Sequence, residues 1–238
     1  METNIVSSLF FLSHRRISGT FLRDKWHLSW RKVALISLLC WFFLLASLVA
    51  HAQGDEAQIR QMIAKAAQAM TSLQCDFVQT KQLRMLNDKM TSEGRMYYSQ
   101  KDKLRWEYVK PYQYTFIMNG DRVLLKNRER SDVIDVRQNK LFREIARIML
   151  SSVVGSSLSD DRTFKTSIAT ASGEWVATLL PQRKDMKQMF QKIILHFDQR
   201  QATVSRVELM EKNGDHTIID LKNIRKNETI APRTFAVE

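Results

Sequence analysis

Residues Lys103–Gly120 read KLRWEYVKPYQYTFIMNG. From Leu104 to Tyr108, apolar side chains alternate with charged ones, which is the period of a β-strand with one apolar face. Pro111 cannot donate a hydrogen bond to a neighbouring strand, so it ends this strand and begins a turn. A second alternating run follows, and Asn119-Gly120 indicates a two-residue hairpin turn into a third strand. The pattern predicts an antiparallel meander with aromatic and methionine side chains on one face.

This apolar face has two interpretations. Aromatic residues at alternating strand positions are most often ordinary packing, and the face is then part of the sheet core. Alternatively, the face is one wall of a cavity for a large apolar ligand. The strand pattern by itself favours ordinary packing, and the rest of the chain has to decide between the two.

The first fifty residues have the pattern of an export signal. The chain has 238 residues, and Val33–Val49 is almost entirely apolar after the basic pair Arg31-Lys32. The run ends in Ala50-His51-Ala52, small residues typical of a cleavage site. We expect residues 1–52 to be an N-terminal extension and secretory signal peptide cut after Ala52, and residues 53–238 to form one domain. Because the run is only slightly short for a membrane span, an uncleaved anchor is the alternative.

Charge and cysteine content argue against a nucleic-acid-binding protein and against a fold held by disulfides. Residues 1–52 contain six of the 37 basic and two of the 25 acidic residues, so residues 53–238 carry a net charge of +8. The basic residues are scattered without a recognisable nucleic-acid module, and export also argues against a nucleic-acid partner. A mild attraction to acidic lipids or proteins is enough to explain the excess. Cys75, the one cysteine after residue 52, alternates with apolar residues and is expected to be buried, so no internal disulfide is expected.

The pattern after residue 52 predicts an amphipathic helix over about Asp55–Ser72, followed by about ten antiparallel strands. The helix residues at apolar spacing are Ile59, Met62, Ile63, Ala66, Met70 and Leu73. Gly94 predicts a bulge or bend. The strands are expected at Gln74–Arg84, Lys89–Ser99, around Leu104 and Tyr114, and at Arg122–Lys126, Ser131–Val136, Arg162–Thr170, Gly173–Leu180, Lys192–Asp198, Thr203–Glu211 and His216–Lys222.

A second helix is predicted between the sixth and seventh strands. Its apolar face consists of Leu141, Phe142, Ile145, Ile148 and Met149. The opposite positions are basic or acidic, as in a helix with one buried face. This helix either caps the sheet permanently or acts as a movable cover.

No catalytic, metal or cofactor site is indicated. His196 and His216 are the two histidines after residue 52, and no His, Cys, Asp or Glu cluster has the spacing of metal ligands. Gly155–Ser159 lacks the glycine spacing of a nucleophile elbow, and no glycine-rich loop could cradle a phosphate. We therefore expect a protein that is not an enzyme and needs no cofactor.

Four motifs follow one another over about fifty residues: Leu73-x-x-x-Phe77-x-Gln79, Glu93-Gly94, Leu104-Arg105-Trp106-Glu107-Tyr108-x-x-Pro111 and Asn119-Gly120. In order and spacing they resemble the LolA family, the periplasmic carriers of outer-membrane lipoproteins. The Leu-Arg-Trp-x-Tyr-x-x-Pro segment is the most specific of the four. In that family a basic residue before a proline helps to hold a lid, whereas Ser99–Lys103 contains no proline. Lys101 or Lys103 would have to replace it.

The resemblance implies a mainly β fold with helices (α+β), namely an unclosed antiparallel β-barrel with a helical lid. It also implies a hydrophobic cavity that shields acyl chains from water. The cavity and lid residues implied are Met96, Tyr98, Leu104, Trp106, Tyr108, Tyr114, Phe116, Met118, Leu141, Phe142, Ile145 and Met149.

The function implied by the resemblance is that of a soluble, monomeric carrier in the periplasm. Such a protein takes acylated lipoproteins from an inner-membrane exporter and delivers them to an outer-membrane acceptor. The alternatives are a LolA-like carrier of another lipid or acylated molecule, and a LolA-like envelope sensor that binds a protein partner. Sensors of that kind usually have a further C-terminal domain, and the chain ends at Glu238, which favours a carrier.

Overall fold

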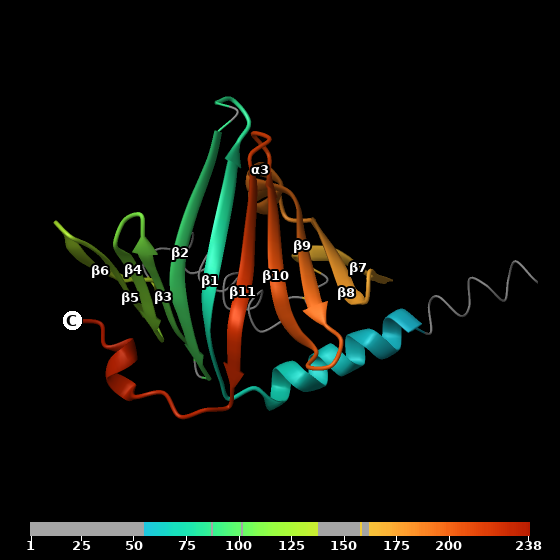
Figure 1. Cartoon of the computed structure of the whole chain (residues 1–238), viewed down its shortest axis with the longest axis horizontal. Coiled ribbons are helices and arrows are strands. Elements are labelled where there is room, and N and C mark those ends of the chain that lie inside the picture. The colour runs from blue at the N-terminus through green and yellow to red at the C-terminus, as the bar shows by residue number, and fades with distance from the viewer. Residues whose placement is uncertain (1–54, 87, 101, 138–157, 159–161) are drawn as a thin grey trace, which may run out of the picture. The chain divides into compact units, whose positions relative to one another are not determined.

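The computed structural model describes residues 55–86, 88–100, 102–137, 158 and 162–238. Among these residues, eleven strands form one antiparallel sheet in the order β6-β5-β4-β3-β2-β1-β11-β10-β9-β8-β7 (Figure 1). The strands are β1 (Ser72–Leu83), β2 (Asp88–Ser99), β3 (Lys103–Lys110), β4 (Tyr114–Asn119), β5 (Arg122–Asn127), β6 (Ser131–Asp135), β7 (Phe164–Ala171), β8 (Glu174–Pro181), β9 (Phe190–Asp198), β10 (Thr203–Glu211) and β11 (His216–Lys226). The sheet is unclosed, with β6 and β7 at its edges, and the predicted mainly β class is confirmed.

Strand β1 lies in the middle of the sheet and joins its two halves. It pairs with β2, the next strand in the chain, and with β11, the last one. Phe77 therefore lies opposite Gly94 on one side and opposite Leu221 on the other. All other neighbours in the sheet are consecutive in the chain.

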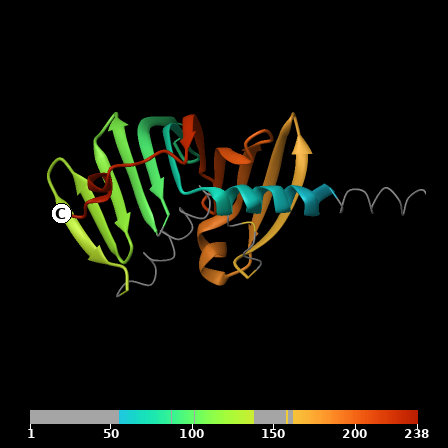
Figure 2. The same cartoon turned by 90° about the horizontal axis from the view of Figure 1, so that it is seen from below.

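Residues 55–69 form an α-helix, which lies at the end of the strands opposite the β1–β2 turn (Figures 1 and 2). Ile59 and Ile63 are buried in the same apolar cluster as the inner face of the sheet. The predicted helix is thus confirmed, but it stops before Ser72, where β1 begins. Met62 lies at the margin of the apolar stripe and is 39% exposed.

Gly94 marks an irregularity between β2 and β3, as its position in the sequence predicts. Glu93 pairs with Lys110 and Gly94 with Tyr108, so Val109 is an extra residue in β3. A Cβ atom at position 94 would lie 2.1 Å from the backbone oxygen of Glu107 and 2.3 Å from Cζ of Phe77. The absence of a side chain therefore lets the Phe77 ring lie directly against β2.

The C-terminal segment covers part of the opposite, outer face of the sheet. After β11, the 3₁₀ helix η2 (Pro232–Phe235) brings Phe235 and Val237 onto Ile117 of β4 and Leu124 of β5. The four side chains are buried together in a second, smaller apolar cluster. Asn119 Nδ2 donates a hydrogen bond to the carbonyl oxygen of Phe235 at 3.1 Å. Figure 2 shows this segment, in red, crossing the green strands.

A short helix interrupts the strand series before β9. The segment Gln182–Phe190 contains the short helix α3 (Lys184–Met189), with Met186 buried, and Phe190 already begins β9. The predicted helix around Leu141–Met149 lies outside the described residues. No helix in the described part of the chain is both long and apolar enough to cross a bilayer.

Candidate functional site

The predicted apolar face is formed by three neighbouring strands, β2, β3 and β4. Pairing between them aligns the side chains in cross-strand rows. One row contains Met96, Trp106 and Phe116. The next row contains Tyr98, Leu104 and Met118, and a third pairs Tyr108 with Tyr114. All eight of these predicted site residues thus lie on one face, and all belong to or pack against the same apolar cluster.

Burial within this face is graded. Met96 and Leu104 are fully buried, and Trp106, Phe116 and Met118 are nearly so. Tyr98, Tyr108 and Tyr114 are half-buried and pack against the edge of the cluster. The aliphatic and sulfur-containing side chains thus form the deepest part of the wall, and phenol rings lie nearer the solvent.

Phe77 of β1 is central to this wall, although its side chain was not among the predicted site residues. Its ring centroid lies 4.4 Å from that of Trp106 and 5.2 Å from that of Tyr108, the latter in an edge-to-face arrangement. Tyr108 in turn lies 6.4 Å from Tyr114. The signal for Phe77 was present in the Leu73-x-x-x-Phe77 motif, but its contacts depend on the pairing of β1 with β2 and on Gly94.

The wall carries no charged side chain of its own. Burial raises the pKa of the phenols of Tyr98, Tyr108 and Tyr114, so these groups are neutral at physiological pH. The Tyr108 hydroxyl donates a hydrogen bond to Gln79 Oε1 at 2.9 Å. Within the described part of the chain, Trp106 Nε1 is a buried donor without a hydrogen-bond partner. A neutral wall of this kind suits apolar contacts and offers no acid, base or nucleophile for chemistry.

Cys75 of β1 lies opposite Met96 of β2 and therefore continues the cross-strand row of Met96 and Trp106. Burial, assisted by the nearby Asp76 carboxylate, raises the pKa of its thiol to about 12. The thiol is therefore protonated at neutral pH and behaves as a small apolar group, as predicted.

The predicted lid lies outside the described residues. Its members are Leu141, Phe142, Ile145 and Met149, and Lys101 also lies outside them. Lys103 begins β3 next to Leu104, and neighbouring strand residues point to opposite faces. Its side chain therefore lies on the outer side of the sheet rather than on the apolar wall.

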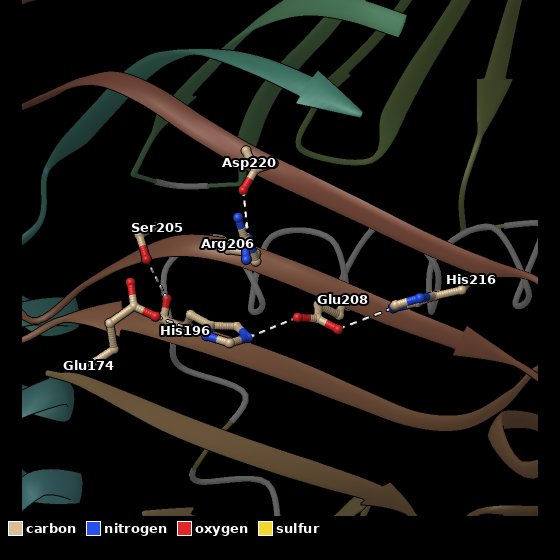
Figure 3. Close-up of polar contacts among 7 residues, drawn as sticks. All are labelled: Glu174, His196, Ser205, Arg206, Glu208, His216 and Asp220. Carbon is tan, nitrogen blue, oxygen red and sulfur yellow. Dashed lines mark hydrogen bonds and ion pairs between the residues drawn. The ribbon is translucent and has the colours of Figure 1, made fainter. Parts of the chain in front are cut away.

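A polar network on the other half of the sheet contains His196 and His216, the two histidines of the described residues (Figure 3). His196 Nδ1 lies 3.0 Å from Glu174 Oε2, and His196 Nε2 lies 3.0 Å from Glu208 Oε1. Glu208 continues the chain to His216 Nε2 at 3.1 Å. His196 alternates with the buried Leu195 and Phe197, so the network lies on the outer face of β8–β11.

This network links neighbouring strands rather than forming a reaction centre. Its members come from four strands, and Arg206 pairs separately with Asp220 at 2.6 Å (Figure 3). In the described residues, no three His, Cys, Asp or Glu side chains gather as a metal site. The chain of contacts was not predictable from sequence, because its four residues are separated by up to 42 positions and meet only through strand register.

The chain matches one protein family over most of its length. Residues 68–238 match the family described as "Outer membrane lipoprotein carrier protein LolA". The chain belongs to the LolA family. It is 24% identical over 207 residues to an outer-membrane lipoprotein carrier protein of Methylococcus capsulatus, covering 87% of this chain and 92% of the relative. It is also 24% identical over 195 residues to the Nitrosospira multiformis protein of the same name, covering 82% and 88%.

Solved structures of LolA-like proteins resemble this chain at low similarity. A LolA superfamily protein from Nitrosomonas europaea has a TM-score of 0.40 and 10% identity, covering 74% of this chain and 96% of that protein. The complex of MucA and MucB from Pseudomonas aeruginosa gives a TM-score of 0.47 and 13% identity, covering 77% of this chain and 61% of the other. The LolA-family proteins are carriers of outer-membrane lipoproteins that act in the periplasm, and they are not enzymes.

Proposed function

We propose that the face of β2, β3 and β4 is one wall of a cavity that shields the acyl chains of lipoproteins. The observation that carries the proposal is the uncharged, contiguous set of eight side chains on three adjacent strands of a LolA-family chain. Ordinary core packing would explain the burial of Met96 and Leu104. The graded exposure of Tyr98, Tyr108 and Tyr114 favours a wall whose rim lies near an opening.

The physical problem of carrying a lipoprotein fits such a wall. Each acyl CH₂ group exposed to water costs about 0.8 kcal/mol, so two or three long chains cost on the order of tens of kcal/mol in total. A carrier must enclose the chains and yet release them. Met96 and Met118 supply flexible, polarisable surface that adapts to a mobile chain. The aromatic rings around them supply broad apolar contact area.

The proposed route of the cargo runs from an inner-membrane exporter to an outer-membrane acceptor. The apolar run Val33–Val49 and the small residues before Gln53 support export through a cleaved signal peptide. The predicted helix at Leu141–Met149 supplies a cover that opens at each transfer. The chain itself acts as a monomer without a cofactor.

The test compares two buried tryptophans of the same apolar cluster. Trp106 on β3 is 5% exposed and Trp175 on β8 is 8% exposed, so Trp106→Glu and Trp175→Glu introduce the same charge at matched burial. We expect Trp106→Glu to lower the affinity for a palmitoylated lipopeptide at least about tenfold more than Trp175→Glu does, because a carboxylate would face the acyl chain. Binding is measured by fluorescence anisotropy and folding by circular dichroism. Equal losses in both variants, or no lipopeptide binding by the wild type, would contradict the proposal.

A further inference from the structure

The tip of the β1–β2 hairpin exposes apolar side chains that nothing in the described structure covers. Met85 and Leu86 are 94% and 71% exposed, in a turn where small polar residues are usual. Met90, just inside β2, is 47% exposed on the same hairpin. Three large apolar side chains close together at a loop tip are unlike the scattered surface residues of a typical soluble protein.

The hairpin is a stiff support for this tip. β1 and β2 pair without interruption from Ser72 opposite Ser99 to Leu83 opposite Asp88. On the other side of β2, pairing with β3 begins only at Glu93, so the segment Asp88–Ser92 extends past β3 in the described sheet by roughly 17 Å. Figure 1 shows the β1–β2 turn at the top of the view, beside the turn between β10 and β11.

The charges around the tip leave a small positive excess. Arg84 and Lys89 flank the apolar pair, and exposed Lys212 lies in the neighbouring β10–β11 turn, whose Gly214 contacts the Arg84 side chain. The two acidic groups of that turn share one cation, because Lys81 Nζ lies 3.0 Å from Glu211 and 3.6 Å from Asp215.

Asp88 is the acidic residue of the hairpin tip itself, and its Oδ1 accepts a hydrogen bond from the Lys89 backbone N–H at 2.7 Å. Counting Lys81 with the two carboxylates that it contacts, four cations lie around the tip against the three anions Asp88, Glu211 and Asp215. Exposed apolar residues bordered by cations are the chemistry that recognises the interface of a bilayer with acidic lipids.

We propose that the β1–β2 tip inserts Met85 and Leu86 into the surface of a bilayer containing anionic phospholipid. The apolar pair enters the boundary between headgroups and acyl chains, and Arg84, Lys89 and Lys212 contact the headgroup phosphates. The contact is shallow and reversible, because it uses two side chains and a few charges rather than a spanning segment. It places the protein at a membrane without occupying the apolar wall on β2–β4.

The test uses the compact unit Gln53–Glu238, which contains every described element and both apolar clusters, so that Val33–Val49 does not bind the vesicles itself. Flotation with vesicles of phosphatidylethanolamine and phosphatidylglycerol measures binding of the wild type and of Met85→Ser/Leu86→Ser. The matched control is Val133→Ser/Leu180→Ser, which removes apolar residues that are 46% and 43% exposed elsewhere on the sheet.

We expect the tip variant to bind at least about tenfold more weakly, the control to bind like the wild type, and added salt or phosphatidylcholine vesicles to weaken binding. A fluorophore attached at Leu86→Cys should shift to the blue on vesicle addition, while Cys75 stays unlabelled because it is buried. No vesicle binding by the wild type, equal binding by the tip variant, or assembly of a second copy through the tip would overturn the proposal. Lipopeptide binding by the tip variant is measured separately and should be unchanged. A failure of the membrane-insertion proposal is therefore distinguishable from a failure of the acyl-carrier proposal.

Discussion

At the scale of single residues, the wall depends on four positions that fit against one another. Gly94 leaves space for the Phe77 ring, and the Phe77 ring supports Trp106 and Tyr108. A side chain at position 94 would meet both a backbone oxygen and that ring. The glycine in the Glu93-Gly94 motif is therefore a packing requirement of the aromatic wall.

Cys75 gives a prediction about pH at the same scale. The pKa of its thiol is raised from 9.0 to about 12 in the native state, so the unfolded state loses this proton first as the pH rises above 9. The native state is then penalised, and we expect the free energy of unfolding to fall by about 1 kcal/mol between pH 9 and pH 10 from this group alone. Denaturant unfolding of the wild type and of Cys75→Ala measures the effect, since all other titrating groups are common to both. An identical pH dependence in the two proteins would contradict the assignment.

At the scale of elements, the C-terminal segment stabilises the outer face of β4 and β5. Its Phe235 and Val237 side chains cover Ile117 and Leu124, which the two strands cannot bury by themselves. The inner face of the same strands is thereby left to form the aromatic wall, while the outer face is covered by the chain's own residues.

Removing the Phe235 ring tests this role. Phe235→Ala is expected to lower the free energy of unfolding by about 3–5 kcal/mol, because the ring is buried and leaves a cavity over Ile117 and Leu124. Urea denaturation followed by circular dichroism measures the change. Val133→Ala on the exposed side of β6 is the control and should change stability by less than about 0.5 kcal/mol. Similar, small effects of both substitutions would show that the segment does not stabilise the sheet.

At the scale of the whole molecule, the sequence predicted the local elements better than the contacts between them. Alternation gave the strands and placed Met96, Trp106 and Phe116 on one face, because side-chain direction in a strand follows from position alone. Alternation could not predict the pairing of β1 with β11. Neither loop length nor alternation determines which strand pairs with a strand that is distant in the sequence. The C-terminal cluster and the His196 network went unpredicted for the same reason.

The proposal that the wall binds acyl chains is tested most directly by crosslinking. A palmitoylated lipopeptide with a diazirine in its acyl chain is bound to the protein and irradiated, and the labelled peptides are mapped by mass spectrometry. We predict labels on the inner-face residues of β2, β3 and β4, such as Met96, Trp106 and Tyr114, that disappear when unlabelled lipopeptide competes. Labels confined to the outer face or to the C-terminal segment, or labels that competitor does not remove, would contradict the account.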